Sequence, residues 1–216
     1  MKRIRDKELI ASIIEDLKKM HPEAACALDH RSLFELVVAV VLSAQTTDVS
    51  VNKVTPVLFE RYPDPEALAA ADRSEVEDII RTIGLYKNKA ANIIKLAQKL
   101  NEDYGGEVPG NFDDLVSLPG VGRKTANVVL AEGFKVPRIA VDTHVFRVSN
   151  RIGLAEADDV NETEKQLMES IPEHLWILAH HLLIFHGRKC CKARKPECNN
   201  CLLNDKCCFY GRKMVQ

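Results

Sequence analysis

Residues 118–124 read Leu-Pro-Gly-Val-Gly-Arg-Lys, a pattern typical of a tight turn between two helices. Upstream of the turn, Asn111 is a good helix N-cap, and Phe112, Leu115 and Leu118 recur at helical spacing. The pattern therefore predicts a short helix over residues 112–117 that ends just before the turn.

The turn depends on Pro119, Gly120 and Gly122. The proline disfavours helical geometry at the residue before it, and both glycines permit positive φ angles. A second helix is predicted from about residue 121 to 132, with Gly133 just past its end. Glycine amides and the free N–H groups of the second helix, aided by its dipole, can hold a phosphate. A plain turn between packed helices is the alternative.

Arg123 and Lys124 follow the turn at once, within the first turn of the second helix. Cations at this position oppose the helix macrodipole, so they call for a functional explanation. The positive helix end and the neighbouring guanidinium also disfavour a lysine ammonium, which would make Lys124 a neutral amine and a nucleophile. An ordinary surface lysine is the alternative interpretation.

Composition restricts the classes of protein that the chain can belong to. Its 216 residues suffice for one domain or two lobes, and the formal net charge of −1 excludes a global polycation. Any nucleic-acid binding must come from local charge, or the charge run is simply solvated. One run of five basic residues contains no acid: Arg188, Lys189, Lys192, Arg194 and Lys195. No apolar run of membrane-spanning length and no signal peptide is visible, so we expect a cytoplasmic protein without membrane contact.

Periodicity predicts an all-α fold. Leu33–Leu42 is rich in valine and could form a buried strand on local propensity, yet no second strand-like run exists to pair with it. We therefore predict a buried helix. Further helices are expected around residues 9–17, 67–71, 76–80, 90–100, 141–151 and 173–186, the fifth of these capped by Asp142 or Thr143.

Six of the seven cysteines lie between Cys190 and Cys208, which indicates a metal site instead of disulfides. Counted from Cys191, the spacing is C-x6-C-x2-C-x5-C. Zinc ribbons generally use two CxxC pairs and this chain has one, so the spacing favours a [4Fe–4S] cluster over zinc. The doublets at 190–191 and 207–208 leave the choice of ligands open.

Five segments together resemble the endonuclease III family, a group of helix-hairpin-helix DNA glycosylases with a C-terminal iron–sulfur loop. They span nearly the whole chain in the same order. The segments are LSAQTTD at 42–48, TIGLYKNKA at 82–90, LPGVGRKTANVVL at 118–130, AVDTHVFRVSNR at 140–151 and HGRKCCKARKPECNNCLLNDKC at 186–207.

The resemblance implies an all-α, two-lobed helix-hairpin-helix DNA glycosylase fold with a [4Fe–4S] loop. A six-helix lobe of residues 26–136 would carry the hairpin, and residues 1–25 plus 137–216 would form the iron–sulfur lobe. It implies a bifunctional glycosylase and AP lyase that excises oxidised pyrimidines in base excision repair. The base is flipped out of the duplex, an amine attacks C1′, and β-elimination cuts the strand 3′ to the abasic site.

Site residues follow from the same resemblance. Lys124 would be the nucleophile, with Asp142 assisting it, although that aspartate could serve only as a helix cap. Contacts with double-stranded DNA that carries damaged pyrimidines or abasic sites are expected at Gln45, Leu85, Gly120, Val121, Gly122, Arg123, His144, Lys192, Arg194 and Lys195. The cluster ligands are expected to be Cys191, Cys198, Cys201 and Cys207. The enzyme is expected to be a monomer associated with the nucleoid.

Two alternatives share the scaffold. A mismatch-specific adenine glycosylase would lack the lysine at position 124 and would carry a carboxylate within Leu36–Leu42, where this chain has none. A thymine-mismatch glycosylase is harder to dismiss from the sequence, because the shape of the base-binding pocket decides which base is excised. The third alternative is a non-catalytic DNA-binding module, which would form no covalent intermediate.

Overall fold

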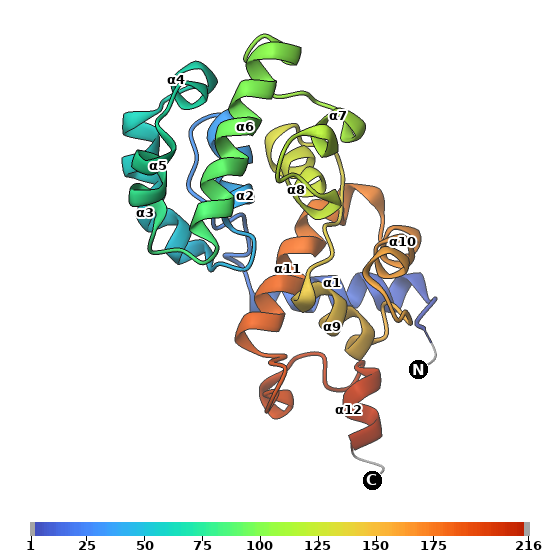
Figure 1. The fold of residues 1–216 in the computed structure, drawn as a ribbon. Coiled ribbons are helices and arrows are strands. Elements are labelled where there is room, and N and C mark those ends of the chain that lie inside the picture. The colour runs from blue at the N-terminus through green and yellow to red at the C-terminus, as the bar shows by residue number, and fades with distance from the viewer. Residues whose placement is uncertain (1–2, 214–216) are drawn as a thin grey trace. The chain divides into compact units, whose positions relative to one another are not determined.

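The computed structural model describes residues 3–213, and helices are the regular secondary structure throughout that range (Figure 1). The all-α prediction is thereby confirmed. The chain divides into two compact units, one of residues 27–136 and one of residues 1–26 with 137–216. Among the described residues, no helix combines the length and apolar character that crossing a bilayer requires.

The unit of residues 27–136 is built around one long helix and one buried helix. Its helices are α2 (Leu33–Leu42), α3 (Asp48–Arg61), α4 (Pro65–Ala69), α5 (Arg73–Ile80), α6 (Tyr86–Tyr104), α7 (Phe112–Ser117) and α8 (Arg123–Gly133). These are seven helices within 27–136, one more than the six that the resemblance implies. The shortest of them is the five-residue α4, which Asp64 caps and Pro65 begins.

Helix α2 is the core of this unit, as predicted for Leu33–Leu42. Every residue from Phe34 to Leu42 is buried, and the Ser32 side chain caps the helix by accepting from the Glu35 amide at 3.1 Å. The helix packs against α3, α6 and α8. Valine-rich sequence has a preference for strands, but complete burial on all sides of a helix overrides it.

The second unit joins the N-terminal helix to the C-terminal part of the chain. Its helices are α1 (Lys7–Met20), α9 (Thr143–Ile152), α10 (Val160–Ser170), α11 (Trp176–Lys189) and α12 (Cys208–Lys213), with short 3-10 turns at Glu173–Leu175 and Cys198–Asn200. Isoleucine, leucine and valine side chains of α1, α9 and α11 form one apolar core. The cysteine-rich loop leaves this core directly from the end of α11.

Two helices of this unit differ slightly from their predicted bounds. Helix α9 starts at Thr143 with Asp142 as its N-cap and runs to Ile152. Helix α11 starts three residues later than predicted, because Glu173–Leu175 form a 3-10 turn after Pro172. It continues three residues beyond His186 to Lys189.

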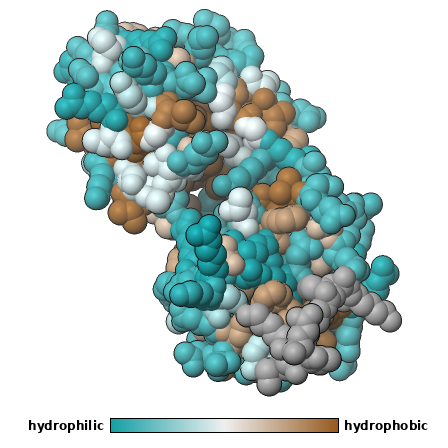
Figure 2. Space-filling view, turned by 60° about the horizontal axis from the view of Figure 1, so that its bottom comes forward, coloured by the Kyte–Doolittle hydropathy of each residue, from teal (hydrophilic) through white to brown (hydrophobic). Residues whose placement is uncertain are grey.

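The surface is mixed in polarity. Figure 2 shows one face on which small hydrophobic groups lie between hydrophilic residues. Large apolar side chains that are strongly exposed are single residues such as Val49 at 67% and Leu85 at 56%. Scattered exposed apolar residues are normal in folded proteins, so each needs its own local explanation.

The pairing of α9 with α11 depends on a close approach at Gly187. A Cβ built on this glycine would lie 2.9 Å from the Cβ of His144 and 3.1 Å from Cγ2 of Val148. Real Cβ atoms do not approach this closely, so a side chain at position 187 would push the two helices apart.

We therefore expect Gly187→Ala to destabilise the protein by overpacking. Gly211→Ala in α12 is the matched control, since a Cβ there meets nothing within 4 Å and gains only helix propensity. In urea unfolding, Gly187→Ala should be less stable than Gly211→Ala by about 1–3 kcal/mol. Equal stability of the two variants would contradict the tight contact between α9 and α11.

Candidate functional site

The hairpin between α7 and α8 is a tight turn of Leu118, Pro119, Gly120 and Val121. The Val121 amide donates to the Leu118 carbonyl at 3.1 Å, and Gly120 has φ of +80°. Proline second and a positive φ third are the features of a type II turn. Of the two glycines that permit a positive φ, only Gly120 adopts one, because Gly122 is the extended N-cap of α8 with φ of −95°.

Gly120 also lies against two other helices of its unit. A Cβ at this position would be 3.1 Å from Cγ1 of Val41 in α2 and 3.1 Å from Cβ of Asn92 in α6. Leu118 and Val121 on either side are buried. The turn is therefore fixed by the core, and its backbone shape does not depend on a ligand.

Helix α8 begins at Arg123, two residues later than predicted, and Gly133 is its last residue instead of the residue after its end. No side chain caps its N-terminus. The first amides of the helix therefore lack the usual side-chain acceptor, which is the condition for binding an anion. Arg123 and Lys124 are exposed, and the Arg123 guanidinium lies 5.4 Å from the centre of the Phe112 ring.

Two exposed residues in the loops before α3 and α6 have unusual backbone geometry. Gln45 has φ of +53° and Leu85 has φ of +59°, although neither is a glycine. The loops are neighbours, because a Cβ on Gly84 would lie 3.9 Å from the Gln45 carbonyl oxygen. Left-handed geometry in non-glycine residues costs free energy and concentrates at functional sites. The Leu85 side chain is also exposed, so it is not part of the core.

A buried lysine fastens these two loops together, and sequence reasoning missed it. The Lys89 ammonium donates to the Thr46 hydroxyl at 2.6 Å. Burial lowers the pKa of Lys89 below its ordinary value, since little water reaches the charged form. The lysine comes from α6 and the threonine directly follows Gln45, so this hydrogen bond holds Gln45 beside Leu85.

In the other unit, Asp142 is the N-cap of α9. Its Oδ1 accepts from the amides of His144 at 2.8 Å and Val145 at 2.7 Å. Its second carboxylate oxygen makes neither of these bonds. The cap therefore orients the carboxylate and leaves one oxygen for other chemistry.

His144 lies in the interface between α9 and α11. It is half-buried, its Nδ1 is 3.3 Å from Nη2 of Arg147, and it faces the backbone of Gly187. Burial lowers the pKa of His144, partly offset by the nearby Asp142 carboxylate. These contacts hold the imidazole within the interface between the two helices.

The cysteine-rich loop folds around a pocket inside its own unit. Cys191, Cys198, Cys201 and Cys207 all line it, and Cys190 joins them, together with apolar side chains such as Ile152 and Leu203. Cys208 instead packs against Gly153, where a Cβ would meet its sulfur. The described fold thus gathers the four expected ligands and one further thiol.

The environment of these thiols suits a metal. Burial raises the pKa of Cys190 to about 12, and it raises the pKa values of Cys201 and Cys207 as well. In the protein alone, thiolates in this pocket would be poorly compensated. A bound metal supplies the missing positive charge and deprotonates the thiols that coordinate it.

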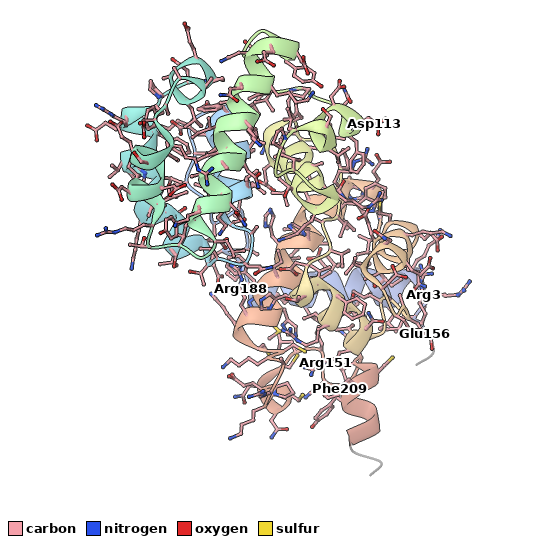
Figure 3. All side chains as sticks on the ribbon, viewed as in Figure 1. Arg3, Asp113, Arg151, Glu156, Arg188 and Phe209 are labelled. Atoms are coloured by element: carbon pink, nitrogen blue, oxygen red, sulfur yellow. The ribbon has the colours of Figure 1, made fainter. Side chains whose placement is uncertain are left out.

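Two arginines of α9 hold the loop, and sequence reasoning missed them. Arg147 donates to the carbonyls of Gly187 at 2.9 Å and Cys191 at 3.1 Å. Arg151 donates to the carbonyls of Lys192 and Ala193 and lies 3.5 Å from the Cys191 sulfur. Arg151 and Phe209 are labelled in Figure 3, and the guanidinium lies 4.7 Å from the ring centre. Their spacing of four residues on one helix face was the available signal.

The basic residues of the loop are exposed. Lys192, Arg194 and Lys195 all face solvent, and Lys195 has a positive φ of 54°. Lys192 forms an ion pair with Glu197 at 2.6 Å, while Lys189 pairs with Glu23. Exposed pairs of this kind contribute little to stability, so these cations remain available to an anionic partner.

Comparison with known proteins identifies the family. A family model described as HhH-GPD superfamily base excision DNA repair protein matches residues 38–173. Endonuclease III of Bacillus subtilis (strain 168) is 53% identical over 195 residues, which are 90% of this chain and 89% of the relative. The chain belongs to the endonuclease III family. Endonuclease III of Escherichia coli (strain K12) is 47% identical over 90% of this chain and 92% of its own length.

Solved structures of endonuclease III have the same fold. A trapped endonuclease III–DNA covalent intermediate, in an estranged-adenine complex, matches with a TM-score of 0.91 and 51% identity. The match covers 98% of this chain and all of that one. A non-covalent endonuclease III–DNA complex matches with a TM-score of 0.92 and 50% identity over 99% and 100% of the two chains. The predicted helix-hairpin-helix glycosylase fold is thereby confirmed.

The capping role of Asp142 in this endonuclease III relative can be measured apart from chemistry. Asp142→Ala removes the acceptor of two amide hydrogen bonds, so it should lower the free energy of unfolding by about 1 kcal/mol. Asp142→Asn keeps an acceptor oxygen and should lie close to wild type in the same urea titration. If both variants lost the same stability, the two hydrogen bonds of the cap would not be the cause.

Proposed function

We propose that the protein is a bifunctional DNA glycosylase and AP lyase that removes oxidised pyrimidines from duplex DNA in base excision repair. One observation carries the proposal: an exposed lysine stands in the first turn of a helix whose N-terminus is uncapped and follows a rigid type II turn. Backbone amides there bind a DNA phosphate, and the lysine beside them reaches the sugar. Membership in a family of base excision repair proteins supports this function.

Lys124 is the proposed nucleophile. Its Nζ adds to C1′ of the flipped nucleotide as the glycosidic bond breaks, and the damaged base departs with the bonding electrons. Proton loss from nitrogen and opening of the sugar ring give an imine between Nζ and C1′. Removal of a C2′ proton then expels the 3′ phosphate, and water hydrolyses the imine to release the lysine. Covalent catalysis divides one difficult step into easier ones. A relative trapped as a covalent DNA intermediate supports this chemistry.

Asp142 is the proposed partner of this lysine. One carboxylate oxygen is occupied by the amides of His144 and Val145, which fixes the orientation of the other. That second oxygen accepts a proton from the attacking amine or stabilises positive charge as it develops on the sugar. Helix capping and catalysis are compatible because they use different oxygens.

Gln45 and Leu85 are proposed to occupy the space that the flipped nucleotide leaves in the duplex. Flipping costs a few kcal/mol, and side chains that enter the stack offset part of this cost. Both residues are exposed, both have strained backbones, and Lys89 fastens their loops together. An exposed apolar side chain on a fixed loop suits insertion between bases.

The remaining contacts are proposed along the backbone of the DNA. Gly120 and Gly122 present amides, Val121 lies between them with its own amide bonded inside the turn, and Arg123 adds a cation at the same place. His144, Lys192, Arg194 and Lys195 are proposed to contribute from the other unit. Phosphate contacts by cations make binding fall steeply with salt, whereas they carry no sequence information.

We further propose that Cys191, Cys198, Cys201 and Cys207 hold a [4Fe–4S] cluster. The donor set fits, since all four thiols line one pocket. When bound, the cluster cross-links the loop that carries Lys192, Arg194 and Lys195. The two compact units would then be the hairpin lobe and the iron–sulfur lobe of an enzyme that works as a monomer on cytoplasmic, nucleoid DNA.

The lyase step predicts a trappable imine. With duplex DNA that contains thymine glycol, wild type plus borohydride should give a covalent protein–DNA product on a denaturing gel. Lys124→Ala should reduce trapping by at least about 100-fold, because no other amine replaces the nucleophile. Asp142→Asn should still bind DNA while losing most of this product.

Several results would reject parts of this function. The proposed enzymatic activity would be rejected if wild type gave no crosslink, or if Lys124→Ala trapped as well as wild type. If the protein excised thymine from a G·T mismatch and left thymine glycol intact, its substrate would be mismatched thymine and not oxidised pyrimidines. Arg188→Ala is a suitable control, because this exposed cation has no role in the proposed chemistry.

The cluster predicts iron in the purified protein. Protein from iron-replete cells should be brown, with about four iron atoms per chain and broad visible absorption. Cys198→Ser should lose most of this iron, whereas Cys26→Ser should keep it, because Cys26 lies outside the cysteine loop. A colourless, zinc-loaded wild type from the same cells would contradict the cluster.

A further inference from the structure

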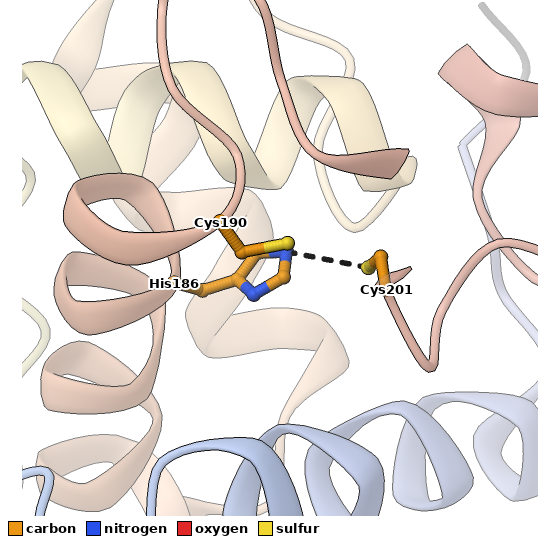
Figure 4. A group of neighbouring side chains, drawn as sticks. All are labelled: His186, Cys190 and Cys201. Atoms are coloured by element: carbon orange, nitrogen blue, oxygen red, sulfur yellow. Dashed lines mark hydrogen bonds between the residues drawn. The ribbon is translucent and has the colours of Figure 1, made fainter. Parts of the chain in front are cut away.

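His186, Cys190 and Cys201 form a second group of metal-binding side chains in the cysteine pocket, and only Cys201 among them belongs to the proposed cluster. The ligand atoms of His186, Cys190 and Cys201 all lie within 4.8 Å of one another (Figure 4). His186 and Cys190 are 2% and 7% exposed. His186 and Cys190 stand one helical turn apart at the end of α11, so their side chains leave the same face.

The distances approach those of a tetrahedral zinc site. Zn–S bonds of about 2.3 Å and Zn–N bonds of about 2.0–2.1 Å place ligand atoms roughly 3.6–3.8 Å apart. The Nε2 of His186 lies 3.7 Å from the Cys201 sulfur. Movements of about 1 Å or less would bring the remaining pairs to the same separation.

The groups behind the ligands are also arranged as they are around bound metals. The Nδ1 of His186 is 3.1 Å from Nε2 of His21, so an N–H at Nδ1 leaves the Nε2 lone pair directed at the sulfurs. The Leu203 amide lies 3.4 Å from the Cys201 sulfur and donates to it. A hydrogen bond at the far nitrogen of a histidine and amide donors to a thiolate are common second-sphere partners of metals.

Charge favours a divalent ion in this position. A histidine that binds a metal does so as a neutral imidazole, so His186 would add no charge of its own. Two thiols that lose their protons to solvent contribute two negative charges. One Zn²⁺ with two thiolates and one imidazole therefore has a net charge of zero, which suits a buried site.

We infer that His186, Cys190 and Cys201 form a second, thiolate–imidazole site for Zn²⁺ that competes with the iron–sulfur cluster for Cys201. Three protein ligands leave the fourth position of a tetrahedral ion to water or another donor. Because one sulfur cannot serve both sites in their complete form, zinc and the cluster exclude each other. Cys190, which has no part in the proposed cluster, acquires a function as a zinc ligand. The inference concerns metal binding alone and does not depend on lyase activity.

The test uses the full-length chain with the cluster removed by Cys207→Ser. This variant should bind about one Zn²⁺ per chain, and Co²⁺ in its place should give ligand-field and thiolate charge-transfer bands. Adding Cys190→Ser should weaken Zn²⁺ binding by more than the roughly 100-fold typical of outer-sphere changes. Adding Cys208→Ser instead is the matched control and should leave zinc affinity unchanged.

Competition is tested without removing any cluster ligand. Wild type and Cys190→Ser are grown with excess zinc and limiting iron, and zinc and iron are counted per chain. Wild type should gain zinc as it loses iron, whereas Cys190→Ser should keep the cluster and exclude zinc. Three results would overturn the inference: zinc bound equally well with Cys190→Ser, no zinc in folded Cys207→Ser, or zinc bound to wild type beside a complete cluster. Unchanged trapping by Cys190→Ser would keep this question separate from the lyase activity.

Discussion

The contact between α9 and α11 at Gly187 is the constraint on which the C-terminal unit depends. Without a side chain at this position, the two helices approach closely enough for Arg147 of α9 to bond the Gly187 carbonyl. One end of α9 presents the Asp142 carboxylate, and α11 leads straight into the cysteine loop. A single helix pair therefore positions both the proposed catalytic carboxylate and the metal-binding loop.

In the unit of residues 27–136, core packing positions the residues that are proposed to contact DNA. The type II turn is wedged between Val41 of α2 and Asn92 of α6, and Lys89 fastens the loop of Gln45 to that of Leu85. The residues proposed to contact DNA are therefore attached to a fully buried helix, α2, through short connections. Pre-organised groups of this kind lose little conformational freedom on binding, which favours tight recognition of a distorted duplex.

Sequence predicts the elements of this protein well because its helices have strong local signals. Phe112–Ser117 was predicted with the bounds that the structure has, and the apolar run at Leu33–Leu42 could be assigned because no partner strand existed. Sequence alone could not tell which glycine of the turn adopts a positive φ, since glycine permits that conformation without requiring it, and only Gly120 has it.

The sequence predicted the site less completely than the fold. The resemblance to endonuclease III implied the cysteine set, but nothing in the sequence showed that the fold brings Cys190 and His186 to Cys201. The sequence also gave no sign of the roles of Arg147, Arg151 and Lys89. The two arginines bond backbone carbonyls of a distant segment, and Lys89 bonds a single distant hydroxyl. Nor could sequence alone tell that Leu85 is exposed, since leucine at a helix start is ordinarily buried.

The backbone character of the hairpin has a consequence for how this protein tolerates mutation. If amides bind the phosphate, then no side chain at the turn can be deleted to abolish that contact. Substitution in the turn would instead be limited by the space available to a side chain. Most residues could change, whereas position 120 could accept nothing larger than hydrogen between Val41 and Asn92. The most sensitive position in the hairpin would thus be the residue with the least chemistry of its own.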